Sequence, residues 1–203
     1  MSILAHAETN PSWITPIAPF RIADNLYYVG SQDLASYLVV TTKGNILINA
    51  NLASSPPQIR TSVEKLGFRW KDTKILLNSQ AHDDHMGGAA EVIRATHAKN
   101  LVMDGDVSVV ETGARTDFLA PSPNVPGYSA VHVDRVLHDQ DTVRLGGVTL
   151  TAHKTAGTRA DVLPGPCTLI SRVSQRERRG TSSSSEVQAS GRNTTWLLHP
   201  ATP

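Results

Sequence analysis

The segment at residues 80–85, Gln-Ala-His-Asp-Asp-His, concentrates side chains that can bind metal ions. His82 and His85 offer imidazole nitrogens and Asp84 offers a carboxylate, and zinc accepts both kinds of donor. Gln80 offers only a neutral amide oxygen, which is a weaker ligand. Because neighbouring residues point in different directions, one short segment could serve two metal ions at once. The alternative is a polar loop in which the histidines occur by chance.

The position of this segment favours the metal site over the chance loop. It follows an apolar stretch, Ile75-Leu76-Leu77, that predicts a short buried strand. Loops that leave a strand end commonly carry binding residues. Gly87 and Gly88 come directly afterwards and allow a close approach of the backbone before the next helix.

The remaining elements predict a layered α/β fold, because strand pairs are followed by alternating strands and helices. Ser55 and Gly67 have the residue types that begin and end a helix, and Ala90, Ile93 and Ala95 are expected to face inward in the next one. Residues 114–130 form a loop rich in Pro, Ser and Gly. The expected strands are 25–30, 35–41, 45–50, 74–77, 101–103, 133–137 and 142–154, the last with a turn at Gly146-Gly147, and the expected helices are 56–66, 87–97 and 107–112.

Composition excludes several classes of function. The chain of 203 residues has 19 Lys plus Arg against 18 Asp plus Glu, so net charge gives no attraction to nucleic acid or to an anionic membrane. No apolar run approaches the roughly 18 residues of a membrane span. Cys167 is the only cysteine, so no disulfide can form within the chain.

The composition changes near residue 157. Residues 1–157 carry 13 basic and 15 acidic residues, whereas residues 158–203 carry six Arg, no Lys and three acids. The second stretch also has seven Ser and shows no sustained period of 2 or 3.6, so it predicts no ordered element. One interpretation is a disordered basic tail.

The N-terminus contains a possible export signal. Ala5-His6-Ala7 has the small-x-small form of a secretory cleavage site, although Met1-Ser2-Ile3-Leu4 is too short for an apolar signal core. We expect the true start to lie upstream and the mature protein to begin near Glu8. An ordinary cytosolic start is the alternative.

The segment Gln80–His85 resembles the zinc signature of the metallo-β-lactamase superfamily, [His/Gln]-x-His-x-Asp-His. Flanking residues narrow the resemblance to class B, subclass 3, of these enzymes, and it covers roughly residues 11–157. Gln80 replaces the commoner His, as in a minority of the subclass. The similar flanking segments are 44–49, 57–59, 65–68, 75–77, 87–88, 104–106 and 143–153.

The resemblance implies two zinc ions, each with three protein ligands. Gln80 and His82 would bind the first zinc, and Asp84 and His85 the second. A zinc-bound hydroxide would open the β-lactam ring of a small-molecule antibiotic without a covalent intermediate, and Asp84 would also orient that hydroxide as a catalytic residue. The implied fold is a four-layer αβ/βα sandwich. The implied location is periplasmic or secreted.

One expected ligand is missing from the sequence. After Thr155-Ala156-Gly157 the family has His-Thr, but this chain has Thr158-Arg159. The third ligand of each zinc is therefore not found here. His97, His132 and His138 match no ligand position of the family pattern, and His153 matches a position that is not a ligand. His199 lies in the irregular tail and is not expected to replace the missing ligand.

A shift of reading frame accounts for this departure. If the codons of residues 157–167 are read with boundaries moved forward by two bases, they permit His-Thr-Arg-Gly-Cys-Thr-Thr-Trp-Thr-Met, which is the expected zinc-binding segment and the strand after it. We therefore expect a metallo-β-lactamase domain at residues 8–157, with an incomplete fold, and an irregular, out-of-frame or disordered tail at 158–203.

The predicted function is zinc-dependent β-lactam hydrolysis, crippled in this chain by the missing ligands. Three alternatives stay open: an inactive truncated remnant, another hydrolase of the superfamily that acts on thioesters or lactones, and a residual zinc-binding module without activity. No nucleic-acid or membrane partner is expected.

Overall fold

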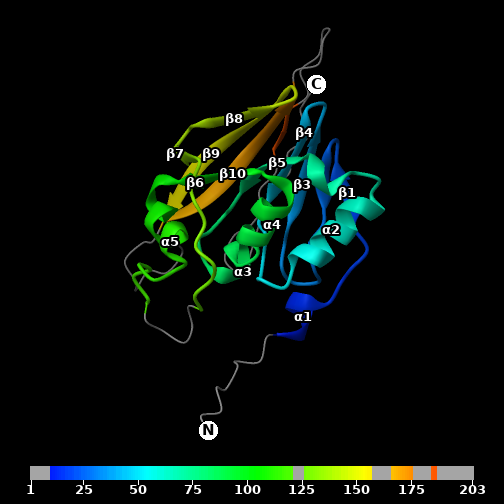
Figure 1. Cartoon of the computed structure of the whole chain (residues 1–203). Helices are drawn as coiled ribbons and strands as arrows, with labels where there is room; N and C mark the ends of the chain where they lie inside the picture. The colour runs from blue at the N-terminus through cyan, green and yellow to red at the C-terminus, as the bar shows by residue number, and fades with distance from the viewer. Residues whose placement is uncertain (1–9, 121–125, 157–165, 176–183, 187–203) are drawn as a thin grey trace.

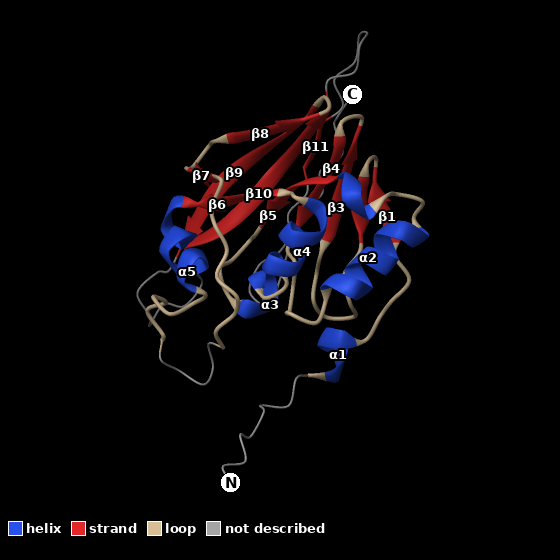
Figure 2. Cartoon of the chain, viewed as in Figure 1, coloured by secondary structure: helices blue, strands red, loops and turns tan. Residues whose placement is uncertain are grey.

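The computed structural model describes residues 10–120, 126–156, 166–175 and 184–186. In these residues the chain forms three layers: helices, a seven-stranded sheet and a four-stranded sheet (Figures 1 and 2). The two sheets pack against each other, and the helices cover the opposite face of the larger sheet.

The larger sheet follows the chain, with neighbouring strands in the order β1-β2-β3-β4-β5-β6-β7. Strands β1 to β4 pair antiparallel as hairpins, whereas β4 to β7 pair parallel and need crossover connections. The parallel strands therefore end at one common edge. The strands are β1 (Phe20–Ala23), β2 (Leu26–Tyr28), β3 (Tyr37–Thr41), β4 (Gly44–Ile48), β5 (Thr73–Leu77), β6 (Lys99–Met103) and β7 (Arg135–Leu137).

The smaller sheet is antiparallel, in the order β11-β10-β9-β8. It contains β8 (Thr142–Leu145), β9 (Val148–Ala156), β10 (Pro166–Gln175) and β11 (Ser184–Glu186). Strands β10 and β11 fall within residues 158–203, where the composition predicts no ordered element. Strand β10 pairs with β9 over its whole length, and such pairing uses backbone N–H and C=O groups that every sequence except proline supplies. The rest of 158–203 lies outside the described residues.

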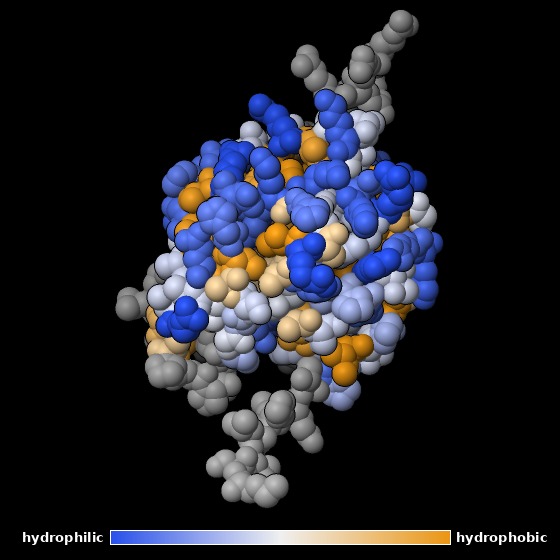
Figure 3. Space-filling view, in the orientation of Figure 1, coloured by the Kyte–Doolittle hydropathy of each residue, from blue (hydrophilic) through white to orange (hydrophobic). Residues whose placement is uncertain are grey.

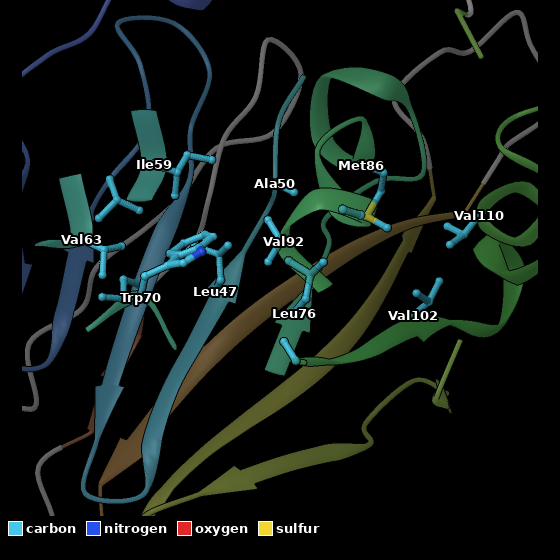
Figure 4. Packing of buried hydrophobic residues seen from close by; sticks show 14 of the residues in the cluster. Leu47, Ala50, Ile59, Val63, Trp70, Leu76, Met86, Val92, Val102 and Val110 are labelled. Carbon is cyan, nitrogen blue, oxygen red and sulfur yellow. The ribbon is translucent and has the colours of Figure 1, made fainter. Parts of the chain in front are cut away.

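The connections of the larger sheet contain the helices. These are α1 (Pro11–Ile14), α2 (Pro56–Lys65), α3 (Asp83–Met86), α4 (Ala89–Thr96) and α5 (Val107–Thr112), with short 3₁₀ turns η1 (Trp70–Asp72) and η2 (Asp104–Asp106). Ile59 and Val63 of α2 pack with Val92 of α4 against Leu47 and Leu76 of the sheet (Figure 4). Ile59 and Val63 are fully buried, so they form the inward face of α2.

A second apolar cluster fills the space between the sheets. Ile46, Leu77 and Met103 of the larger sheet face Val143 and Leu150 of the smaller one. Each such side chain contributes roughly 1.5–3 kcal/mol when it is removed from water. These contacts hold β8 and β9 against the parallel strands that carry the polar segment at residues 80–85.

The observed layers agree with the predicted mixed α/β sandwich. The described residues supply three of its four layers, and a helical layer on the outer face of the smaller sheet is not among them. On the face shown in Figure 3, hydrophilic side chains spread over the helices, and apolar residues reach the surface in separate patches. Within the described part of the chain, no helix has the length and apolarity needed to cross a membrane.

Candidate metal centre

The candidate site lies at the carboxyl edge of the parallel strands. Strand β5 ends at Leu77, and the chain then runs through Ser79 and Gln80 to His82, which begins α3 as its N-cap residue. Residues after β4 meet this segment, because the two strands run parallel and end at the same level. The sequence prediction that the segment leaves a buried strand is therefore confirmed.

Gln80 and His82 come together as one pair of donors. The amide Nε2 of Gln80 lies 2.9 Å from Nδ1 of His82. The other ring nitrogen of His82, Nε2, lies 3.0 Å from Oδ2 of Asp117. A half-turn of the Gln80 amide places its oxygen where its nitrogen now lies. The amide oxygen and Nδ1 can then be aimed at one point beside the ring.

Asp84 and His85 come together as a second pair. Oδ2 of Asp84 lies 3.6 Å from Nε2 of His85, while Nδ1 of His85 lies 3.0 Å from the hydroxyl oxygen of Ser79. Both side chains are largely buried, with 28% and 13% of their side-chain surfaces exposed. Each histidine therefore has one ring nitrogen held by a neighbour and the other directed at its expected partner ligand.

Asn49 supports the second pair from the end of β4. Its side-chain amide donates to the Ser79 hydroxyl at 3.0 Å, and the Ser79 backbone N–H donates to Asn49 Oδ1 at 2.9 Å. The backbone of Asn49 has a φ of 65°, a left-handed conformation that asparagine tolerates better than most residues. The carbonyl of His85 accepts from the backbone N–H groups of Ala50 and Asn51 at 2.9 and 3.1 Å.

The two glycines after the motif permit this close approach. A Cβ atom on Gly87 would lie 2.8 Å from the backbone nitrogen of Ala53. A Cβ atom on Gly88 would lie 2.5 Å from the carbonyl oxygen of Ala50. The short turn between α3 and α4 can therefore pack on the segment after β4 only because both residues lack side chains, as the sequence predicted.

Burial sets the charge states around the site. It lowers the pKa of His85 below its ordinary value, although the charge of Asp84 opposes the shift. The ring is therefore neutral near pH 7 and keeps a free lone pair. Burial, reinforced by the charge of Asp84, raises the pKa of Asp83. Burial also raises the pKa of Asp106 to about 7, with added repulsion from the charges of Asp104 and Asp117.

The donor atoms of Gln80, His82, Asp84 and His85 suit zinc in both their chemistry and their spacing. Imidazole, carboxylate and amide groups are all accepted by zinc, and the two expected pairs meet at 2.9 and 3.6 Å. The two pairs therefore have donor atoms and spacings that suit zinc, and each pair would supply two of the three protein ligands that the resemblance implies for one ion. No group of three or more His, Cys, Asp or Glu among the described residues is placed to hold a metal.

Three other described histidines have partners outside the candidate site. His132 lies near Glu111, His138 near Asp104, and Nδ1 of His153 lies 2.9 Å from Gln140. Residues 157–165, where the family would supply a further ligand, and His199 lie outside the described residues. Sequence reasoning missed the partners Asp117, Ser79 and Asn49, because none of them belongs to the motif.

A family profile and a solved structure both match this chain. Residues 34–163 match the sequence profile of the Metallo-beta-lactamase superfamily. The chain is 45% identical to the native FEZ-1 metallo-beta-lactamase from Legionella gormanii, with a TM-score of 0.76, and the match covers 85% of this chain and 63% of that one.

Two further solved structures are similar. The class B3 di-zinc metallo-beta-lactamase LRA-12 from an Alaskan soil metagenome is 38% identical, with a TM-score of 0.76 over 87% of this chain and 64% of that one. The metallo-beta-lactamase GOB-18 from Elizabethkingia meningoseptica is 38% identical, with a TM-score of 0.78 over 92% and 66%. The chain thus spans less than two thirds of the length of each of these three structures.

Proposed function

The chain belongs to the metallo-beta-lactamase superfamily, and on that premise we propose that its activity is zinc-dependent hydrolysis of β-lactam antibiotics. The three solved structures compared above are metallo-beta-lactamases, and LRA-12 is a di-zinc enzyme of class B3. The substrate proposed here is accordingly a small-molecule β-lactam.

One observation carries the proposal. The four expected ligands form two converging pairs, Gln80 with His82 and Asp84 with His85. In each pair the far ring nitrogen of the histidine has its own hydrogen-bond partner. Metal-binding histidines characteristically have such a partner, which fixes the tautomer and the ring orientation.

The residues of this chain would hold the metal and manage a proton. Zinc, when bound, supplies a Lewis acid and makes hydroxide available as a nucleophile at neutral pH. His85 is neutral because burial lowers its pKa, so Nε2 can serve as a ligand without first losing a proton. Asp84 lies beside that nitrogen and can accept a hydrogen bond from the attacking water, which would orient it toward the ring carbonyl. We propose Asp84 as the catalytic residue.

Zinc binding without hydrolysis is the second candidate. The observation that favours it is the count of donors, since each expected ion has two ligands among the described residues, whereas catalytic zinc sites use three. Loss of the third ligand through a shifted reading frame after about residue 157 would cripple the enzyme. A read of the coding DNA that restores no Gly-His-Thr in another frame would contradict the frameshift.

We also propose a periplasmic or secreted location. The support is the resemblance and the small-x-small sequence Ala5-His6-Ala7, which lies outside the described residues. Cell fractionation followed by N-terminal sequencing would test it, and retention of Met1 in the native protein would contradict it.

Hydrolysis of a carbapenem, followed by its ultraviolet absorbance with and without added zinc, tests the main proposal. We expect zinc-dependent turnover that Asp84→Asn abolishes. The matched control is Asp33→Asn, an exposed carboxylate that accepts from Ser12, and it should leave turnover unchanged. Turnover of a thioester but not of the carbapenem would favour another hydrolase of the superfamily.

Zinc content separates the remaining outcomes. Equilibrium dialysis that shows bound zinc without turnover of either substrate would support the binding module. Dialysis that shows no retained zinc would contradict both the enzyme and the module, and would leave an inactive remnant.

A further inference from the structure

Asp117 lies outside the metal-binding motif but contacts it directly. Its Oδ2 lies 3.0 Å from Nε2 of His82, which is 35 residues earlier in the chain. Its side chain is only 5% exposed, whereas that of His82 is 25% exposed. A buried carboxylate that meets one ring nitrogen of an expected ligand is well placed to control the other nitrogen.

Hydrogen bonds to both of its oxygens hold the Asp117 carboxylate in place. Its second oxygen, Oδ1, accepts from the backbone N–H of Leu119 at 2.8 Å, and the backbone N–H of Asp117 donates to the carbonyl of Ala114 at 3.2 Å. Both oxygens are thus engaged. The backbone of residues 114–119 therefore sets the position of the Asp117 carboxylate relative to the His82 ring.

The loop is in turn fastened to the motif. The Tyr128 hydroxyl donates to the carbonyl of Ala81, the residue before His82. A Cβ atom on Gly113 would clash with the carbonyl oxygen of Tyr128 at 2.1 Å, and Gly113 has a φ of 65°. Residue 113 can therefore lie against Tyr128 only as glycine, which brings the chain before Asp117 close to the residue that contacts Ala81.

From these contacts we propose that Asp117 is a positioning residue that holds His82 in the tautomer protonated on Nε2. An ionised carboxylate can only accept a hydrogen bond, so the proton of a neutral imidazole must sit on Nε2. Nδ1 then carries the lone pair and faces Gln80. The metal-binding part of this inference rests on the proposed function, but the tautomer does not.

Nitrogen-15 NMR of the full chain, labelled at histidine and free of metal, tests the tautomer directly. We expect His82 to be protonated on Nε2. In Asp117→Asn the amide can donate instead of accept, so the form protonated on Nδ1 should become the major one. His85, held by Ser79, should not change, and this distinguishes positioning from a general loss of structure.

Zinc affinity, measured by competition with a chelator, gives the second readout. We expect Asp117→Asn to weaken zinc binding by about 10- to 100-fold, the range found when such outer partners are removed. The control is Glu111→Gln, which alters another carboxylate near a histidine, His132, outside the site. It should leave zinc affinity unchanged.

The tautomer of His82 in the two proteins decides between the possibilities. His82 protonated on Nδ1 in the unaltered protein would overturn the proposal even if the variant failed to fold. An unchanged tautomer in a folded Asp117→Asn would also overturn it. The expected tautomers in a protein that binds no zinc would support the positioning role and contradict the proposed function.

Discussion

The hydroxyl oxygen of Ser79 lies 3.0 Å from Nδ1 of His85. Asn49 holds that hydroxyl from the end of the neighbouring strand, so the orientation of the imidazole depends on two segments of chain. Rotation of the ring away from this position would break the contact. Because Ser79 is not itself an expected ligand, its contribution to zinc binding can be measured without removing a ligand.

Replacement of Ser79 by alanine should weaken zinc binding without unfolding the protein. We expect Ser79→Ala to lose about tenfold in zinc affinity, because the far nitrogen of His85 loses its partner. Chelator competition measures the effect. Ser54→Ala, an exposed serine before α2, should change nothing, and an equal loss in that variant would contradict the assignment.

The stability of the protein should depend on pH through Asp106. Burial raises its pKa from 3.8 to about 7, so between these values the native state binds a proton that the unfolded chain has released. The free energy of unfolding therefore falls as pH rises through this window, by on the order of 4 kcal/mol. Asp106→Asn removes the titration, and this variant should gain stability relative to the unaltered protein between pH 4 and pH 8.

Urea unfolding at a series of pH values measures this difference. Asp72→Asn is a useful contrast, because a hydrogen bond from Arg69 lowers the pKa of that exposed carboxyl. Its loss should change the pH dependence in the opposite direction. A constant difference between Asp106→Asn and the unaltered protein at all pH values would contradict the role assigned to Asp106.

Gly88→Ala should destabilise the fold near the site. The new Cβ would lie 2.5 Å from the carbonyl oxygen of Ala50 and 2.7 Å from Cγ of Pro56, so backbone must shift. We expect a cost of about 1–3 kcal/mol in the free energy of unfolding. Gly67→Ala has open space but a φ of 86°, and should cost roughly 1–2 kcal/mol by strain alone. Thermal unfolding of both variants measures the two costs, and a Gly88→Ala variant as stable as the unaltered protein would contradict the packing argument.

Leu76→Ala should be among the most damaging changes to the core. Leu76 is fully buried between β5 and the helices, and removal of its side chain leaves a cavity. Such changes typically cost about 2–5 kcal/mol. Val136→Ala on β7, where the valine is 40% exposed, should cost far less. Urea midpoints that do not separate the two variants would contradict the placement of Leu76.

Some elements follow from local sequence alone. The range predicted for α5, 107–112, is confirmed residue for residue, and the strands before and after the motif lie where apolar runs predicted them. Ser55 precedes α2 as expected, but its side chain makes no capping hydrogen bond. The serine at position 55 predicted where α2 begins. The helical backbone conformation of Ser55 is not the extended one in which a capping hydrogen bond usually forms.

The inward face of α4 was predicted in part, since Ile93 and Ala95 are half-buried and pack against the core. Ala89, Val92 and Thr96 are buried, whereas Ala90 and Ile93 are only half-buried. The sequence analysis favoured the face with Ala90, Ile93 and Ala95 because it is entirely apolar, whereas the buried face includes Thr96. The structure can bury Thr96 because its hydroxyl donates to the carbonyl of Val92 at 2.7 Å and so has a partner inside the helix.

The sequence by itself determined which residues could bind zinc and that they follow a buried strand, because both properties belong to a short continuous segment. Only the tertiary structure decided what holds those residues. The partners Asp117 and Asn49 are 35 and 36 residues away from His82 and His85, and each reaches the site through a loop or a parallel strand. Contacts of this kind depend on the register between distant strands and on loop conformation, and neither leaves a periodic signal in the chain.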